Sequence, residues 1–256
     1  MKQKLPIIEG NKRIILLGKT RTGKSTMARM LLKMKAAEGW WIIIVDPKKD
    51  WMLRDGGRTV IPYGELDLKG DRPFRGSVDN PIQSNVFIPE AKVIIYEPTS
   101  WDEFLDTMVD AAMTHKFVIF YFDEIRQLAT SNKAPQKFIV LYTQGAAAMC
   151  GAWAGNQRPF GIPTDMKDQA EIWIVFTLID ADDRMDIGKR YMPKNKYTVW
   201  FMLNMLPYYY FLYYDDRMPG PIILPPLDIP GLKPERGISY IEQYRREAGG
   251  SNIQGR

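Results

Sequence analysis

The chain has very few of the residues that build disulfides and metal clusters. Cys150 is the only cysteine and His115 the only histidine among 256 residues. A single cysteine excludes an intrachain disulfide framework and a cysteine-based zinc site, and it suits a reducing compartment. A single histidine likewise excludes a cluster of imidazole ligands.

Long apolar runs are also missing. No run approaches the roughly 18 residues that a helix needs to cross a bilayer. The first residues, MKQKLPIIEGNKR, lack the continuous apolar segment of a secretory signal peptide. We therefore expect a soluble protein of the cytoplasm rather than an integral membrane protein.

The residues that are present are those of an ordinary globular protein, with 45% hydrophobic and 25% charged residues. Lys and Arg outnumber Asp and Glu by 35 to 30, a formal net charge of +5, which favours a polyanionic partner. The length is sufficient to bury a sizeable core. We expect one large α/β domain over residues 1–214, followed by a short extension over residues 215–256.

Apolar segments alternate with helical patterns, which predicts a central, mostly parallel sheet flanked by helices. The last two expected strands, 197–203 and 208–214, are separated by a short loop and predict a C-terminal β-hairpin. Residues 47–92 are rich in Gly, Pro and charge and predict a loop-rich insertion with at most short strands. Six prolines between Pro219 and Pro234 predict that the extension is an extended arm. The other expected strands lie within residues 13–18, 40–46, 92–98, 116–125, 151–159 and 171–178.

The segment GKTRTGKST lies between the first expected strand and the first expected helix, and it matches the phosphate-binding pattern G-x-x-x-x-G-K-[S/T]. In such a loop, backbone N–H groups turn toward phosphate oxygens, and the N-terminus of the helix adds a positive field. We expect Lys24 to reach the terminal phosphates of a nucleotide and the hydroxyl of Ser25 to bind Mg²⁺. The expected nucleotide-binding residues are Gly18, Lys19, Thr20, Arg21, Thr22, Gly23, Lys24, Ser25 and Thr26.

A second candidate is the acidic pair Asp123 and Glu124, at the end of the apolar strand KFVIFYFDEI. Ligands of parallel sheets gather at the carboxyl ends of the strands. We expect Asp123 to hold Mg²⁺ through its water shell and Glu124 to polarise the water that attacks the terminal phosphate. A base for water favours ATP hydrolysis over a GTPase or a small-molecule kinase. The alternative is an acidic pair that only caps a strand.

A third candidate is the segment NQRP at residues 156–159. A polar side chain at the end of a strand beside the phosphate loop, here Gln157, can sense the terminal phosphate and the attacking water. The alternative is a polar turn before Pro159.

The ordered set GKTRTGKST, IIIVDPKKD, VIFYFDEI and AGNQRPFGIP resembles the motifs of the HerA/FtsK superfamily of hexameric DNA-pumping ATPases. The resemblance covers residues 13–191 and implies a P-loop NTPase fold of the RecA/ASCE type. It implies ATP and Mg²⁺ as cofactors, Gln157 as the polar sensor, and an arginine that acts on the ATP of a neighbouring subunit. Arg158 and Arg184 are the two candidates for that arginine and remain unranked, with Arg126 behind them.

The resemblance also implies a homo-oligomeric ring, a hexamer, around double-stranded DNA. Arg126, Lys133 and Lys137 follow the acidic pair and are the expected contacts to DNA phosphates, independent of base sequence. The alternative for them is a solvated loop.

The phosphate loop begins at residue 18, so we expect no N-terminal β-barrel like that of cellular HerA helicases. A nearly bare motor resembles the genome-packaging ATPases of tailless, membrane-containing double-stranded DNA viruses, which would act in the host cytoplasm or with the virion and dock on a capsid vertex or membrane protein. The alternatives are a conjugation or secretion motor, a cellular DNA pump of the same superfamily, and a nucleotide-switched binding module with negligible turnover.

Overall fold

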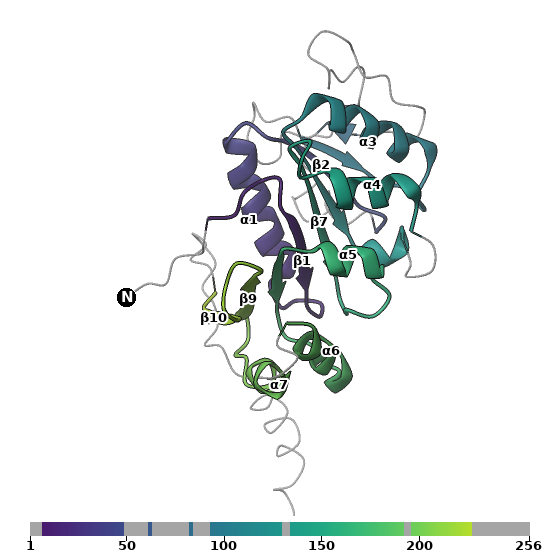
Figure 1. Cartoon of the computed structure of the whole chain (residues 1–256). Helices are drawn as coiled ribbons and strands as arrows, with labels where there is room; N and C mark the ends of the chain where they lie inside the picture. Colours follow the sequence, from purple (N-terminus) through teal and green to yellow (C-terminus); the bar gives the residue numbers. More distant parts are fainter. Residues whose placement is uncertain are drawn as a thin grey trace, which may run out of the picture.

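The computed structural model describes residues 7–48, 61–62, 82–83, 93–129, 134–191 and 196–226. Their backbone forms a ten-stranded sheet with helices on both faces (Figure 1). The strand order is β10-β9-β8-β1-β7-β6-β2-β5-β4-β3. This is the α/β architecture that the alternating apolar segments predict.

Six neighbouring strands in the centre of the sheet run parallel. Each is completely or almost completely buried, as expected for strands that are covered by helices on both faces. In sheet order they are β8 (Ile172–Val175), β1 (Arg13–Leu17), β7 (Cys150–Asn156), β6 (Val118–Asp123), β2 (Trp41–Val45) and β5 (Val93–Tyr96).

Antiparallel strands continue the sheet at both edges. Beyond β5 lie the two-residue strands β4 (Ile82–Gln83) and β3 (Ile61–Pro62). Most of the predicted loop-rich insertion, residues 47–92, lies outside the described residues. Beyond β8 lie β9 (Phe211–Asp215) and β10 (Ile222–Leu224).

Helix α1 (Lys24–Ala37) covers one face of the sheet, whereas α3 (Glu103–His115), α4 (Gln136–Gln144) and α5 (Thr164–Gln169) cover the other (Figure 1). Successive side chains of a strand point to opposite faces, so the sheet separates two cores. Ile14 of β1 belongs to the core that contains Leu31 of α1. Its neighbour Ile15 belongs to the core that contains Leu105 of α3 and Leu141 of α4.

The structure contradicts one strand prediction. Residues 197–203 were expected to form the first strand of the C-terminal hairpin, but they lie in helix α7 (Lys196–Asn204). Val199 and Leu203, one helical turn apart, are buried against the core that holds α3 and α4, and this packing selects the helix. α7 packs on α6 (Ala181–Tyr191).

A C-terminal hairpin is nevertheless present, with different strands. β9 corresponds to the expected strand 208–214, and its partner β10 lies in the proline-rich segment after Asp215. The sheet therefore continues into the first part of the segment that was predicted to be an arm. The predicted arm from residue 227 onward lies outside the described residues.

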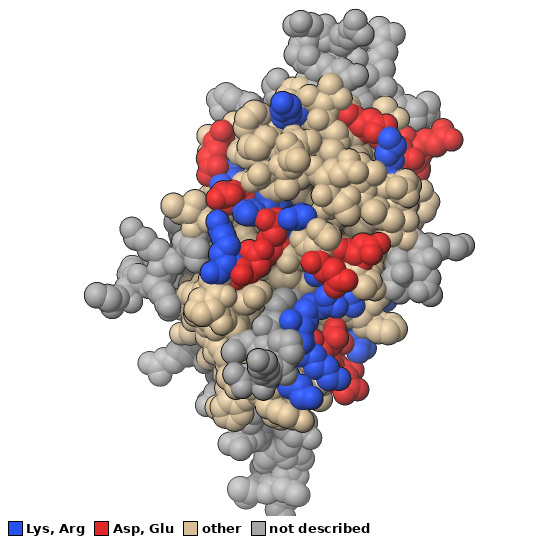
Figure 2. Space-filling view, viewed as in Figure 1, with Lys and Arg blue, Asp and Glu red and all other residues tan. Residues whose placement is uncertain are grey.

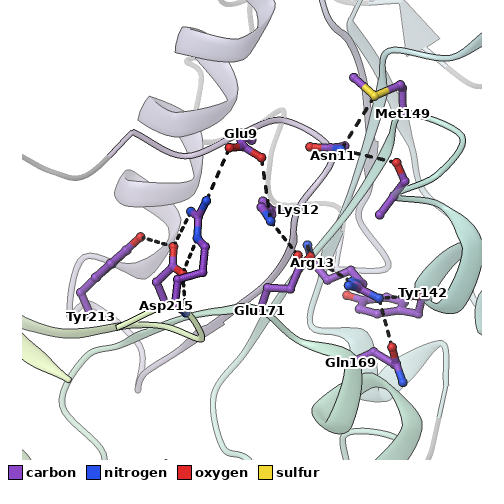
Figure 3. A network of polar contacts seen from close by, with 12 residues as sticks. Glu9, Asn11, Lys12, Arg13, Tyr142, Met149, Gln169, Glu171, Tyr213 and Asp215 are labelled. Atoms are coloured by element: carbon purple, nitrogen blue, oxygen red, sulfur yellow. Dashed lines mark hydrogen bonds and ion pairs between the residues drawn. The ribbon is translucent and has the colours of Figure 1, made fainter. Parts of the chain in front are cut away.

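A polar network ties the start of β1 to the start of β8 (Figure 3). The Nζ of Lys12 donates to Glu171 at 2.8 Å, and the Nε of Arg13 donates to the other oxygen of the same carboxylate at 2.9 Å. Burial alone would raise the pKa of Glu171, but the hydrogen bonds from Arg13 and Lys12 outweigh it and lower that pKa. The network lies at the end of the parallel strands opposite to the phosphate loop.

No helix in the described ranges is long and apolar enough to cross a membrane.

Candidate functional site

The predicted motifs meet at the carboxyl ends of the central parallel strands. Each of them follows a parallel strand, and the four strands concerned, β1, β7, β6 and β2, are consecutive in the sheet. The phosphate loop follows β1, Gln157 follows β7, the acidic pair ends β6, and the Asp-Pro-Lys segment follows β2. Because all four strands point the same way, residues far apart in the sequence become neighbours at their carboxyl ends.

Hydrogen bonds to the flanking strands fix the phosphate loop. The N–H of Gly18 donates to the carbonyl of Asn156 at the end of β7, at 3.3 Å. The N–H of Lys19 donates to the carbonyl of Thr177, just beyond β8, at 3.1 Å. The hydroxyl of Thr22 then closes the loop by donating to the carbonyl of Lys19, at 2.8 Å.

Two glycines of the loop are required by geometry. A Cβ on Gly18 would lie 2.7 Å from the Cβ of Phe176, closer than side chains approach. Gly23 immediately precedes α1 with a φ of 105°, which residues with a side chain rarely adopt. The N–H of Met27 donates to the carbonyl of Gly23, at 2.9 Å, so the N-terminus of α1 lies directly at the end of the loop.

A cavity of about 300 Å³ opens at the carboxyl ends of these strands. Four of its lining residues are cationic and one is acidic, and the first turn of α1 carries no acidic residue. Such a lining is electrostatically suited to a polyphosphate. The lining residues are Lys19, Thr20, Arg21, Gly23, Lys24, Ser25, Thr26, Lys48, Asp123 and Gln157.

Asp123 is the acidic residue of the cavity and is almost completely buried. Its Oδ1 lies 3.8 Å from the Nζ of Lys24 and accepts a hydrogen bond from the hydroxyl of Tyr121 at 3.3 Å. Gly155 is its partner in the register of β7, and a Cβ there would lie 2.5 Å from the Tyr121 oxygen. The small residue at 155 therefore leaves room for this polar cluster.

Ser25 and Asp123 fit the requirements of Mg²⁺, because these two oxygen-bearing residues line the same cavity from two elements. No group of three or more His, Cys, Asp or Glu in the described ranges is placed to hold a metal ion. Mg²⁺ would therefore take most of its ligands from phosphate and water oxygens, as it does in other phosphate sites.

Glu124 follows Asp123 with a φ of 60°, a left-handed conformation that redirects the chain at the end of β6. Its side chain is only 3% exposed, and its Oε2 accepts a hydrogen bond from the Nζ of Lys48 at 2.7 Å. The Nε of Arg126 lies 4.0 Å from the other carboxylate oxygen. Glu124 itself is not among the described residues that line the cavity.

Gln157 lines the cavity from the end of β7, where the resemblance places a polar sensor. The preceding residue, Asn156, is buried, and its Nδ2 donates to the carbonyl of Arg158 at 2.6 Å. This bond shapes the turn that presents Gln157 to the cavity.

The two candidate arginines occupy different environments. The side chain of Arg158 is 47% exposed and pairs with Asp183 at 2.7 Å and Asp180 at 2.8 Å. Its hydrogen bonds to Asp183, and the charges of Asp183 and Asp180, raise its pKa. Arg184 is buried, and its Nη1 donates to the carbonyls of Leu178 and Ile179 in the same chain, at 2.6 and 2.9 Å.

Two of the three predicted DNA contacts lie on different elements of the structure. Arg126 lies in the short 3₁₀ helix η1 (Ile125–Gln127) and its side chain is 51% exposed. Lys137, on α4, donates to Asp110 of α3 at 2.5 Å, so an ion pair between two helices partly neutralises it. Lys133 lies outside the described residues. On the face that Figure 2 presents, Lys and Arg gather mainly around α6, with Asp and Glu among them.

Lys48 is a site residue that the sequence analysis did not assign. The segment DPKK was part of the resemblance, but no role followed from it, because the partner of Lys48 is 76 residues away in the sequence. The signal in the sequence that could have found Lys48 is a basic residue directly after β2, the strand that neighbours β6 in the sheet.

Comparisons with known proteins give likenesses of structure. No protein-family model and no curated protein sequence matches the chain. The genome packaging NTPase B204 from Sulfolobus turreted icosahedral virus 2, in complex with ATP-gammaS, superposes with a TM-score of 0.64 at 17% identity, over 86% of this chain and all of that one. The DNA-packaging ATPase B204 from Sulfolobus Turreted Icosahedral Virus gives 0.63 at 18% identity, again over 86% of this chain and all of that one.

A third solved structure comes from a different biological setting. The conjugation coupling protein TcpA of pCW3, with ATPgS, gives a TM-score of 0.54 at 14% identity, over 85% of this chain and 61% of that one. At such identities the likeness is one of fold. The chain has the fold of these proteins, which confirms the predicted P-loop ATPase architecture and, as a likeness of fold, the resemblance to viral packaging ATPases.

Proposed function

We propose that the chain is an ATP-driven translocase of double-stranded DNA that packages a viral genome into a preformed capsid. The observation that carries the proposal is the meeting of four motifs at the carboxyl ends of β1, β7, β6 and β2, around a cationic cavity. Those are the motifs by which the sequence resembles the HerA/FtsK superfamily. The fold shared with two packaging NTPases supports the same assignment.

The residues around the cavity divide the chemistry among them. The loop Gly18–Thr26 and the N-terminus of α1 would hold the phosphates of ATP, and Lys24 would neutralise charge on the terminal phosphate. Ser25 and Asp123 would hold Mg²⁺, which supplies charge neutralisation and orientation when it is bound. Glu124 would take the proton of the attacking water, and Gln157 would orient that water.

Arg158 is the better candidate for an arginine that acts on a neighbouring subunit. The side chain of Arg158 is half-exposed, and Arg158 directly follows Gln157 in the sequence. Arg184, in contrast, is buried and donates hydrogen bonds to carbonyls of its own chain. An arginine supplied across an interface makes hydrolysis depend on assembly, and we propose a homo-oligomeric ring, a hexamer, as that assembly. Arg126 remains our candidate contact to DNA phosphates near this edge of the sheet.

In this proposal the motor works in the host cytoplasm or with the virion and docks on a capsid vertex or membrane protein. A second candidate function is a conjugation-type motor. The likeness to the conjugation coupling protein TcpA favours it, because the shared fold spans 85% of this chain.

ATP hydrolysis in the presence and absence of DNA tests the proposal. We expect double-stranded DNA of any sequence to raise the turnover number several-fold. The stimulation should fall steeply between about 50 and about 200 mM salt, because phosphate contacts release counterions. Single-stranded DNA at the same nucleotide concentration is the control. Turnover that is indifferent to double-stranded DNA would count against a translocase.

A further inference from the structure

The turn after β2 holds Lys48 in a fixed place. Asp46, the residue after β2, is completely buried, and its N–H donates to the carbonyl of Tyr96 at 2.7 Å. Its Oδ1 accepts the backbone N–H of Lys48 at 3.2 Å, which closes an Asx turn across Pro47. The Asp-Pro-Lys segment therefore fixes the position of Lys48 at the carboxyl end of β2, beside β6.

The side chain of Lys48 is the closest ionic partner of Glu124 among the described residues, at 2.7 Å against 4.0 Å for Arg126. The carboxylate is only 3% exposed. A carboxylate removed from water needs a counterion, and a charge-assisted hydrogen bond of this length supplies one. The position of the Glu124 carboxylate therefore depends on Lys48.

Lys48 also lines the cationic cavity, together with Lys24, whereas Glu124 is not among the described lining residues. Lys48 therefore contacts the candidate base through its ammonium group and also borders the cavity proposed for the phosphates. A phosphate group carries more charge and more acceptor oxygens than a carboxylate, so it competes for the same three donors.

We propose that Lys48 is a positioning residue that exchanges partners: it holds the carboxylate of Glu124 away from the cavity, and releases it when a terminal phosphate takes up its ammonium group. Glu124 then becomes available to the attacking water only when a triphosphate is bound. This inference rests on the proposed ATP hydrolysis at the same cavity, but not on DNA as the partner.

The competition predicts a measurable coupling between the two residues. Glu124→Gln removes the charge that competes for Lys48, so Lys48 is free for the phosphate. The variant should bind a non-hydrolysable ATP analogue about tenfold more tightly than the wild type, the size of effect expected of one charged hydrogen bond. ADP, which lacks the terminal phosphate, should bind the two proteins equally.

A double-mutant cycle isolates this effect. Wild type, Glu124→Gln, Lys48→Met and the double variant are compared by calorimetric titration with the analogue and with ADP, without DNA. We expect Glu124→Gln to have no effect on analogue binding in the Lys48→Met background. Lys48→Met alone should reduce the preference for the analogue over ADP, and Lys48→Arg should keep part of it. Thermal unfolding curves of all variants verify that each is folded.

Equal effects of Glu124→Gln in the wild-type and Lys48→Met backgrounds would overturn the proposal, and so would an unchanged preference for the analogue in Lys48→Met. Because no DNA is present, these outcomes are independent of whether the protein proves to be a translocase. If none of the four proteins bound the analogue, the proposed ATP site itself would be refuted, and the exchange with it.

Discussion

The Nζ of Lys24 lies 3.8 Å from the Oδ1 of Asp123, and both side chains are more than nine-tenths buried. One residue belongs to the first turn of α1 and the other to the last position of β6, with β7 between β6 and β1. This contact joins the two halves of the candidate site, the loop for phosphates and the acidic pair for metal and water.

Loss of the Lys24 charge should weaken nucleotide binding. In Lys24→Ala we expect the affinity for ATP to fall by about 10- to 100-fold, because hydrogen bonds to charged groups contribute about 1.5–3 kcal/mol. Titration calorimetry measures the affinity. Lys33→Ala, on the exposed side of the same helix, is the matched control and should bind like the wild type. Unchanged binding in Lys24→Ala would mean that the cavity is not the nucleotide site.

Loss of the Glu124 carboxylate should separate binding from turnover. A general base contributes about 10²- to 10⁴-fold to a rate, so Glu124→Gln should lose at least about 100-fold of the ATP turnover number while it still binds ATP. A steady-state phosphate-release assay measures this. Glu103→Gln, at the exposed start of α3, is the control for the same chemical change. Turnover that survived in Glu124→Gln would assign the base elsewhere.

Mixing experiments test the arginine that acts between subunits. We expect Arg158→Ala and Lys24→Ala to be inactive alone and to regain part of the activity when mixed, because each supplies what the other lacks. Arg190→Ala, which loses a pair with Asp168, should be active alone. If mixing restored no activity, Arg158 would act within its own chain, in which it forms ion pairs with Asp180 and Asp183.

The end of β9 contributes stability that depends on pH. Hydrogen bonds from Arg217 lower the pKa of Asp215 to about 2 from its usual 3.8, against the opposing effect of burial. A lowered pKa stabilises the fold above pH of about 4, and the stabilisation is lost as the pH falls through about 2. Urea unfolding should therefore find Arg217→Gln less stable than the wild type at pH 7, with the gap closing toward pH 2. A gap that did not change with pH would assign Arg217 an uncharged packing role.

Local patterns predicted much of the fold and the first parts of the site. The phosphate loop lies between β1 and α1 because strand, glycine loop and helix are consecutive in the sequence. The apolar run before Asp123 likewise marked a central strand, and the carboxyl-end rule for parallel strands then placed the acidic pair near the loop.

The remaining features depend on contacts that no local pattern encodes. The segment 197–203 is apolar at both strand and helix spacing, and only the burial of Val199 and Leu203 against a distant core decides for a helix. The partner of Lys48 is similarly distant in sequence. Arg158 and Arg184 were equivalent in the sequence and differ only in what surrounds them in the fold.

Displacement of a bound third strand tests the central claim, ATP-driven movement along double-stranded DNA. A triplex-forming oligonucleotide is annealed at one end of a linear duplex, and its release is followed with ATP, with ADP, and with the Glu124→Gln variant. We predict release by the wild type with ATP only, after a delay that lengthens with the distance between the free end and the triplex. Absence of release under conditions in which the wild type hydrolyses ATP on DNA would contradict the claim.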